Sequence, residues 1–219
     1  MKANGEKALE KKVLRHEIRK ILTDAILNGE IAPGERIVET RIAKELDVSQ
    51  APVREAIREL EQMGIVETQP YKGAFVKVVN KEEVFEAYKL RVLLEGYSAQ
   101  VVTEKLDEVL LEKFKQLLDN MIRCAEEGNR PDFIENDIAF HELIIKSTGS
   151  NLIYRVWSMV NMAHLPYLTF AKSTMGFPSL VLQHQRIYDA FQEGDSKKAA
   201  LAVQQHIEEL GSKLSNHFE

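Results

Sequence analysis

Residues 49–64 read SQAPVREAIRELEQMG, a helix-forming stretch with a proline close to its start. Ser49 is a residue type that favours the N-cap of a helix, which places Pro52 in the first turn. A proline costs little in that turn, because the first N–H groups of a helix have no acceptor within the helix. The stretch is therefore expected to begin a helix at its serine and to end it at Gly64.

The two sides of this helix differ in character. Apolar residues recur at helical spacing and predict the buried side: Val53, Ile57 and Leu60. Gln50, Arg54 and Arg58 lie four residues apart on another face. Such a face is often simply solvated, but Arg can form paired bonds to guanine and Gln to adenine, and both can bind phosphates. The structure predicted for the neighbouring segments distinguishes a solvated face from a DNA-binding one.

Those segments predict a helix-turn-helix with a hairpin after it. Residues 12–28 have the apolar spacing of a helix, and ETRIAKEL (39–46) predicts a short second helix. Asp47 and Val48 leave a tight turn before Ser49, and Asp47 can take the left-handed conformation that such a turn requires. IVET and GAFVKVV read as two strands joined by QPYKG, a tip that carries Lys72. A hairpin in this position would form a wing beside the DNA.

Composition limits the classes of protein. The chain has 219 residues, 44% of them hydrophobic and 29% charged, which is typical of a globular protein. It lacks an apolar run of the roughly 18 residues that a membrane span needs, and its polar N-terminus does not resemble an export signal. The single cysteine, Cys124, excludes an intrachain disulfide and favours a reducing compartment. We therefore expect a cytoplasmic protein without membrane contact.

The chain changes character near residue 80. Residues 1–80 carry 14 Lys and Arg against 13 Asp and Glu, whereas residues 81–219 carry 15 against 21, within a net charge of −5. The second part reads as about six helices, long enough to form a bundle. The fold class is thus mainly α, with three helices and a small hairpin first and an all-α bundle after them. We expect a flexible leader at 1–11, a DNA-binding domain at 12–79 and a helical domain at 80–219.

Residues 37–76, IVETRIAKELDVSQAPVREAIRELEQMGIVETQPYKGAFV, resemble the winged helix-turn-helix of the GntR family of bacterial transcription regulators. The resemblance covers about 65 residues, and the spacing VSxxPVREAIRxLExxG is specific. It implies that Arg54 contacts DNA, with Ser49 and the Lys72–Gly73 wing as neighbours. We expect the DNA-binding residues to lie on the helix that begins at Ser49 and on the wing: Ser49, Gln50, Ala51, Arg54, Arg58, Lys72 and Gly73. Two residues depart from the family pattern, since Gln50 stands where Arg is usual and Ala51 where Thr is usual. Because one arginine contact is lost, the preferred operator should differ from the common one.

The helical part contains histidines that could form a metal site. Asp137 and His141 are four residues apart, so they share a helix face. His184 and His206 lie among apolar neighbours, which suggests that both face inward. Three imidazoles and one carboxylate that converge in a bundle would suit zinc, nickel, iron or a similar cation. His164 is left outside this set, because the proline that follows it nearby makes its orientation uncertain.

Three segments of this part resemble the all-helical ligand-binding domain of the FadR-type branch of the GntR family: YKLRVLLEGYSAQVV, DIAFHELIIKSTGSNLI and QHQRIYDAFQEGDSKKAALAVQQHI. The resemblance implies that Asp137, His141, His184 and His206 bind a divalent metal, for which Zn²⁺ is the default and Ni²⁺ or Fe²⁺ are alternatives. Arg91 has two interpretations. It can form an intrahelical ion pair with Glu95, or it can bind the carboxylate of an effector.

The leading hypothesis is a homodimeric transcription regulator, a repressor rather than an enzyme. It would bind a pseudo-palindromic operator and respond to a small carboxylate near the metal. The alternatives are a metal-dependent hydrolase that uses the same aspartate and histidines, and a metal that only stabilises the bundle. A hydrolase needs a general base beside the metal, and Glu142, the nearest candidate in the sequence, should point elsewhere.

Overall fold

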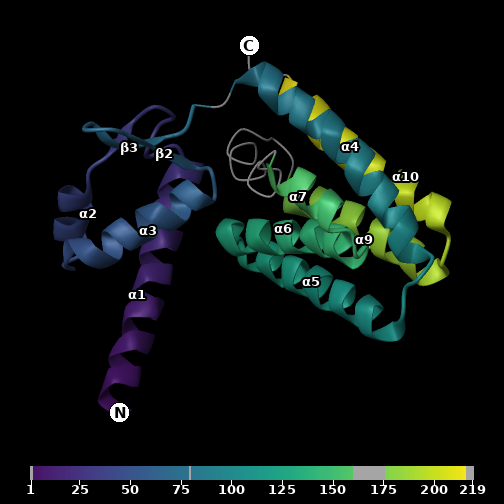
Figure 1. Ribbon diagram of the computed structural model, residues 1–219, viewed down its shortest axis with the longest axis horizontal. Coiled ribbons are helices and arrows are strands. Elements are labelled where there is room, and N and C mark those ends of the chain that lie inside the picture. Colours follow the sequence, from purple (N-terminus) through teal and green to yellow (C-terminus); the bar gives the residue numbers. More distant parts are fainter. Residues whose placement is uncertain (1, 79, 160–175, 216–219) are drawn as a thin grey trace. The chain divides into compact units, whose positions relative to one another are not determined.

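The computed structural model describes residues 2–78, 80–159 and 176–215, and divides the chain into two compact units, Met1–Val79 and Asn80–Glu219. The first unit contains helices and a small sheet, and the described part of the second is all helical (Figure 1). This confirms the expected fold class. No helix among the described residues is long and apolar enough to cross a membrane.

The first unit consists of three helices and three short strands, namely α1 (Lys2–Leu27), β1 (Arg36–Ile37), α2 (Glu39–Glu45), α3 (Gln50–Gln62), β2 (Val66–Gln69) and β3 (Gly73–Val76). The strands form an antiparallel sheet in the order β1-β3-β2. The predicted hairpin is therefore present as β2 and β3. Strand β1 was not predicted, because two residues are too few to show the alternation of a strand.

The turn between α2 and α3 follows the sequence prediction in its backbone. Asp47 has a φ of 52°, the left-handed conformation. Ser49 has the extended backbone of an N-cap, but its side chain makes no capping hydrogen bond. Pro52 is the third residue of α3, within the first turn. The local chemistry thus sets the turn and the start of α3, although the serine hydroxyl does not contribute in the expected way.

Helix α3 buries the predicted apolar stripe and one further residue: Val53, Ala56, Ile57 and Leu60. This stripe packs against α1, whose Ile18 and Leu22 are also buried. Arg15 of α1 pairs with Glu59 of α3 at 2.7 Å. Because the apolar side is fixed in this way, the opposite face of α3 is presented to solvent.

Helix α1 begins earlier than expected. A flexible leader is expected at residues 1–11 and the start of the helix at Lys12, whereas α1 starts at Lys2. The segment is rich in Ala, Glu, Lys and Leu, which are good helix formers, and so extends the helix toward the N-terminus.

The described helices of the second unit are α4 (Lys81–Thr103), α5 (Glu108–Glu127), α6 (Arg130–Ser147), α7 (Asn151–Met159), α9 (Phe177–Glu193) and α10 (Ser196–Ser215). Several of their ends have recognisable caps. The side chains of Asn80, Asp107 and Asn129 accept hydrogen bonds from the first turns of α4, α5 and α6. Gly128 and Gly194 end α5 and α9 in the left-handed conformation, which glycine adopts without steric cost.

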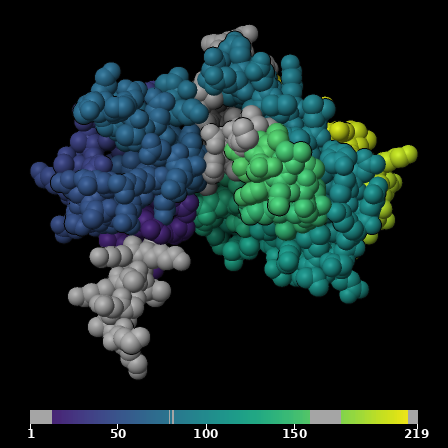
Figure 2. All heavy atoms as spheres, viewed as in Figure 1, coloured from purple at the N-terminus to yellow at the C-terminus, as the bar shows by residue number. Residues whose placement is uncertain are grey.

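In the bundle, α4 packs against α10, α6 and α7, while α5 packs against α6 and α9. Phe114 of α5 lies between Phe140 of α6 and Phe191 of α9, with ring centroids 5.1 and 4.8 Å apart. Helix α7, drawn in green, lies on the face of the unit seen in Figure 2, in agreement with the exposure of Leu152 and Val156. The aromatic core therefore lies among α5, α6 and α9.

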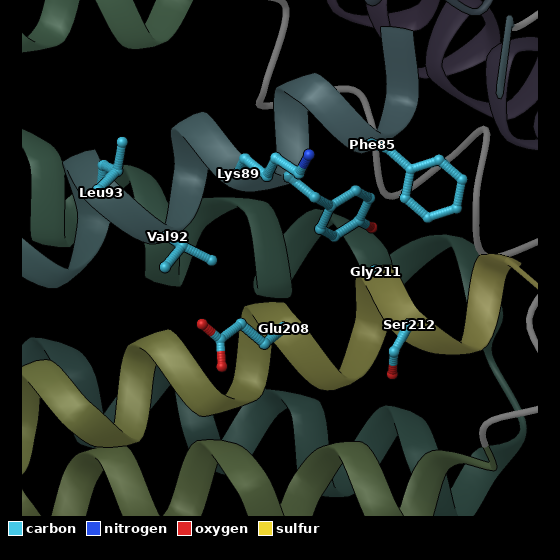
Figure 3. Close-up of a pocket in the computed structure, with 8 residues that line it drawn as sticks. Phe85, Lys89, Val92, Leu93, Glu208, Gly211 and Ser212 are labelled. Carbon is cyan, nitrogen blue, oxygen red and sulfur yellow. The ribbon is translucent and has the colours of Figure 1, made fainter. Parts of the chain in front are cut away.

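Helices α4 and α10 approach each other closely at Gly96, where an added Cβ would come within 2.6 Å of the Gln204 side chain. Farther along the same pair lies an apolar groove of about 440 Å³, lined by Phe85, Val92 and Leu93 of α4 and by Gly211 and Ser212 of α10, among others (Figure 3). None of the residues predicted to bind metal or effector lines this groove.

Candidate functional site

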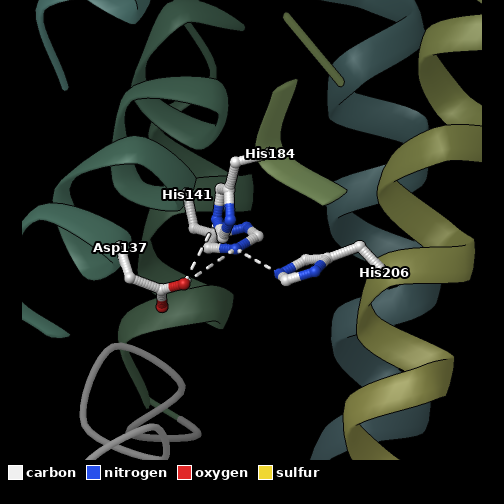
Figure 4. A group of neighbouring side chains, drawn as sticks. All are labelled: Asp137, His141, His184 and His206. Atoms are coloured by element: carbon white, nitrogen blue, oxygen red, sulfur yellow. Dashed lines mark hydrogen bonds and ion pairs between the residues drawn. The ribbon is translucent and has the colours of Figure 1, made fainter. Parts of the chain in front are cut away.

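The four predicted metal ligands come together in the second unit. Asp137 and His141 lie on α6, His184 on α9 and His206 on α10, and all four are buried (Figure 4). One ligand atom from each residue lies within 4.8 Å of the others. We call these four residues the donor cluster. Three different helices thus deliver three nitrogens and one oxygen to a single buried point.

Within the cluster, the Nε2 atoms of the histidines face the carboxylate or one another. His184 Nε2 lies 3.2 Å from Asp137 Oδ1, and His141 Nε2 lies 4.0 Å from the same oxygen. The Nε2 atoms of His141 and His206 are 3.2 Å apart.

The other ring nitrogen of each histidine has an acceptor on its outer side. Nδ1 of His184 lies 2.9 Å from the Leu180 carbonyl oxygen, and Nδ1 of His206 lies 2.7 Å from Gln183 Oε1. Nδ1 of His141 lies 2.6 Å from Glu95 Oε2, an ion-pair distance without hydrogen-bonding geometry. A histidine that donates from Nδ1 leaves its Nε2 lone pair free for a metal, which is the usual arrangement of metal-binding imidazoles.

The pKa shifts of His206 and Asp137 favour the protonation states of metal ligands. Burial lowers the pKa of His206 well below its usual value, and His184 and His141 add to this effect. Burial alone would raise the pKa of Asp137, but contact with His184 and His141 outweighs it and lowers the pKa. A neutral imidazole and an ionised carboxylate are the forms that bind metal.

The donor cluster fits a divalent cation. Among the residues that the structure describes, the buried His184 Nε2 has no hydrogen-bond partner, since its contact with Asp137 lacks hydrogen-bonding geometry. A buried polar atom in this state costs free energy, and a cation at the centre would satisfy it. Three imidazoles and one carboxylate suit zinc and the neighbouring transition metals.

The structure of Arg91 is compatible with both interpretations drawn from the sequence, the ion pair with Glu95 and a contact with an effector carboxylate. It is buried on α4, and its Nε lies 2.7 Å from Glu95 Oε1, as the intrahelical ion pair requires. The guanidinium also lies over the Tyr88 ring at 5.5 Å. Its Nη1 is buried and has no hydrogen-bond partner among the described residues. The ion pair uses Nε and therefore does not exclude a contact between Nη1 and an effector carboxylate.

Glu142, which the sequence places next to His141, is not part of the cluster. Glu142 contacts Lys146 Nζ at 2.8 Å and the Tyr154 hydroxyl at 3.2 Å, on a different side of α6 from the ligands. It is therefore not placed as a general base. His164 lies outside the described residues.

A smaller cavity, of about 250 Å³, lies against the donor cluster between α9 and α10. Its lining includes His206 and Gln183, together with the exposed side chains of Arg186, Lys198 and Gln205. It thus reaches a ligand of the cluster from the outside, which the larger α4–α10 groove does not.

The residues predicted to contact DNA lie on the surface of the first unit. Ser49, Gln50, Ala51, Arg54 and Arg58 are exposed along α3, and Lys72 is exposed in the β2–β3 turn beside the half-buried Gly73. We call this set the DNA-reading surface, although its contact with DNA stays a prediction. Arg54 Nε lies 3.0 Å from Glu39 Oε2 of α2, an exposed pair that restrains the guanidinium.

The wing contains a strained residue that the sequence analysis did not single out. Tyr71 has a φ of 64° and a fully exposed side chain. Gly73 follows with a φ of 103°, and a Cβ there would come within 3.2 Å of Arg36 Nε on β1. A glycine is therefore needed at this point of the turn, whereas nothing buries the tyrosine ring.

Several interactions around the cluster could not be found in the sequence. Gln183 and Glu95 hold two of the three histidines, but neither stands at a spacing that predicts the contact. Leu180 lies one helical turn before His184, so its carbonyl is the only one of the three acceptors that helical periodicity places.

Comparison with known proteins finds one family match in each of the two units. Residues 14–76 match the family described as bacterial regulatory proteins of the gntR family, and residues 86–209 match the FCD domain.

Among relatives, an uncharacterized HTH-type transcriptional regulator from Streptomyces ambofaciens is 31% identical over 88% of this chain and 81% of its own length. The regulator LutR of Bacillus subtilis is 28% identical over 89% and 98% of the two chains. The gluconate operon transcriptional repressor of the same organism is 23% identical over 87% and 81%.

Solved structures share the fold. A protein assigned as a GntR regulator from Rhodococcus sp. RHA1 superposes with a TM-score of 0.70 at 24% identity, over 94% of this chain and 99% of that one. The structure of a metal-free FCD domain gives a TM-score of 0.54 at 15% identity, over 64% of this chain and 97% of that one.

Proposed function

The chain belongs to the GntR family of bacterial transcription regulators and carries an FCD domain, and from this premise we propose that it is a homodimeric repressor controlled by a metal and a small organic acid. Its first unit is a DNA-binding winged helix-turn-helix, and its second is the ligand-binding domain. The observation that carries the proposal is the convergence of four buried ligand atoms within 4.8 Å. The protein would act in the cytoplasm.

In this proposal α3 enters a major groove of the operator. Arg54 contacts a base or a phosphate from the exposed face of α3, and Arg58 contacts the DNA backbone. Lys72 and Gly73 bring the wing to the neighbouring phosphates, while Ser49 and Ala51 lie at the start of the helix. Gln50, which can pair with adenine where the family usually has arginine, shifts the preferred operator sequence.

The proposed dimer uses the exposed side of α4. Leu93 and Tyr97 are 66% and 57% exposed, and with Leu90 they form a stripe at the spacing of a helix–helix contact. The apolar α4–α10 groove continues this stripe through Leu93. A second copy of the chain would cover both, because an exposed apolar strip of this kind on a globular protein marks an interaction surface. Two copies would place two recognition helices on a pseudo-palindromic operator.

In the ligand-binding domain, Asp137, His141, His184 and His206 would hold a divalent metal, most suitably Zn²⁺. The metal would supply open coordination positions for a carboxylate ligand. The Nη1 of Arg91, which has no hydrogen-bond partner in the described part of the chain, would bind a second oxygen of that ligand and fix its orientation. Binding stabilises one arrangement of the domain over another, which lowers the affinity for DNA and relieves repression.

A hydrolase that uses the same residues is not supported. The relatives are transcription regulators, and the candidate base Glu142 is occupied by Lys146 and Tyr154. A metal with a purely structural role remains distinguishable by experiment, because it would stabilise the domain without any response to organic acids.

The test is a thermal-shift screen of small carboxylic acids on zinc-loaded protein, followed by mobility-shift assays on the DNA upstream of its own gene. We expect at least one acid to raise the melting temperature and to release the DNA. The variants His141→Ala and His206→Ala should keep DNA binding but lose the response. If the protein binds no DNA, either alone or with any of the acids, the proposal of a DNA-binding repressor is refuted.

A further inference from the structure

Glu95 is a fully buried carboxylate on α4 to which the proposed function assigns no role. Its Oε1 accepts hydrogen bonds from Arg91 Nε at 2.7 Å and from Trp157 Nε1 of α7 at 3.0 Å. Its Oε2 lies 2.6 Å from Nδ1 of His141 on α6. One side chain therefore links three helices and touches both the proposed effector residue and a proposed metal ligand.

The second oxygen of this carboxylate meets the imidazole of His141. Oε2 and Nδ1 lie 2.6 Å apart, although the pair lacks hydrogen-bonding geometry and neither atom has another hydrogen-bond partner among the described residues. Because the carboxylate pairs as an anion with the Arg91 guanidinium, Oε2 offers only lone pairs to His141. Two lone pairs at this distance would repel each other, so the contact is favourable only when Nδ1 of the imidazole carries a proton.

The same condition prepares His141 for a metal. With its proton on Nδ1, a neutral imidazole has its lone pair on Nε2. That Nε2 faces the centre of the donor cluster, 3.2 Å from His206 Nε2 and 4.0 Å from Asp137 Oδ1. The opposite tautomer would turn an N–H toward the centre and exclude a cation.

We propose that Glu95 is a positioning residue that fixes His141 in its metal-binding tautomer and connects the metal centre to Arg91. This inference rests on the proposed function, because it assumes that the donor cluster binds a metal. The acceptors of the other two histidines are the carbonyl of Leu180 and the amide of Gln183, both uncharged. Among the three groups that face the Nδ1 atoms of the histidines, Glu95 is the charged one. Its contact should therefore have the strongest effect on the basicity of the imidazole that it touches.

The connection to Arg91 gives Glu95 a second consequence. The Nε of Arg91 donates to Oε1, while its Nη1 has no hydrogen-bond partner within residues 2–78, 80–159 and 176–215. The carboxylate that orients the metal ligand thus also orients the group that would bind the effector. Metal and effector binding should depend on each other through this side chain.

The substitution Glu95→Gln preserves volume but changes the hydrogen-bonding pattern. If the amide oxygen stays with Arg91 and Trp157, the amide NH₂ faces His141 Nδ1, which must then accept. The imidazole proton moves to Nε2 and blocks the metal. Loss of such an outer partner weakens metal binding by about 10- to 100-fold in other sites, and we expect a loss of that order here.

The matched control is Glu142→Gln. Glu142 is a carboxylate on the same helix as His141, but it contacts Lys146 and Tyr154 and not the cluster. The zinc affinity of the full-length chain would be measured by competition with a chromophoric chelator for the wild type, Glu95→Gln, Glu142→Gln and His141→Ala. Circular dichroism of the metal-free proteins would verify that each variant is folded.

The inference predicts wild-type affinity in Glu142→Gln and a loss of about 10-fold or more in folded Glu95→Gln. Wild-type affinity in Glu95→Gln would overturn it. If that variant does not fold, Glu95→Asp replaces it, because the shorter side chain keeps the charge but does not reach His141. Unchanged affinity in Glu95→Asp would overturn the inference equally. Failure of the wild type itself to bind zinc, with an affinity no better than that of His141→Ala, would refute the metal site of the proposed function and the inference with it.

Discussion

The DNA-reading surface and the donor cluster are built in opposite ways. Arg54 of the DNA-reading surface is 53% exposed in its side chain and has a single partner, Glu39. His141 of the donor cluster is buried, with contacts to Glu95, Asp137 and His206. An exposed side chain can adapt to its ligand at little cost to the fold, whereas a buried one is fixed by neighbours that depend on it. Substitutions in the first region should therefore affect binding, and those in the second should affect stability as well.

Arg91→Met should give the largest effect on stability. It leaves the buried carboxylate of Glu95 without its cation, and removal of one partner from a buried ion pair costs about 3–5 kcal/mol. Urea unfolding of the metal-free protein would measure the loss. The control is Arg54→Met, which breaks an exposed pair and should change the free energy of unfolding by no more than about 1 kcal/mol. Equal losses in the two variants would break the contrast between the regions.

Zinc should stabilise the second unit alone. At a free zinc concentration about 100 times the dissociation constant, binding adds about 2.7 kcal/mol to the free energy of unfolding. The stabilisation should disappear in His206→Ala and after treatment with a chelator. Hydrogen exchange resolves the two units, and we expect slower exchange with zinc in α6, α9 and α10 but not in α3. A zinc effect that persists in His206→Ala would place the ion elsewhere.

Arg54→Ala should separate binding from stability. Loss of an arginine contact to a base costs about 1–3 kcal/mol of binding free energy, while the fold should tolerate the change. Fluorescence anisotropy with operator DNA would measure the affinity, and a thermal melt would measure the fold. Arg58→Ala should cause a smaller loss of binding free energy, and the loss should be the same for different DNA sequences, as expected for a contact to the DNA backbone. Similar affinities of the wild type and Arg54→Ala for the DNA would show that Arg54 does not contact it.

Tyr71→Asn should have the smallest effect, and in the stabilising direction. Tyr71 adopts a positive φ with its ring fully exposed, and Asn is several-fold more frequent in that conformation than most residues. We expect a gain of about 0.5–1 kcal/mol in the free energy of unfolding, measured by urea unfolding of the full-length protein. A loss of stability would show that the ring makes contacts that offset the backbone strain.

The sequence predicts what local rules govern. The left-handed Asp47, the buried stripe of α3 and the hairpin follow from residue type and spacing, and the structure has them. The four residues of the donor cluster were named from their spacing and apolar neighbours and from a resemblance. The structure brings them together, and their role as ligands stays a prediction.

What the sequence does not predict depends on tertiary packing. The contact of Glu95 with His141 joins residues 46 positions apart on two helices, and that of Gln183 with His206 also joins two helices. Neither has a periodic signal. Strand β1 is too short to be recognised before its partner β3 is placed. The long start of α1 was missed because a charged terminal segment resembles an unstructured leader as closely as it resembles a helix.

The account depends most directly on the metal, so its central test is the metal content of the purified protein. Elemental analysis of the wild type, after dialysis against zinc and removal of the excess, should find about one zinc ion per chain, as a single four-ligand site requires. The variant His184→Ala, treated in the same way, should retain far less. A wild type without bound zinc, nickel or iron, or a His184→Ala variant with the same content as the wild type, would contradict the account.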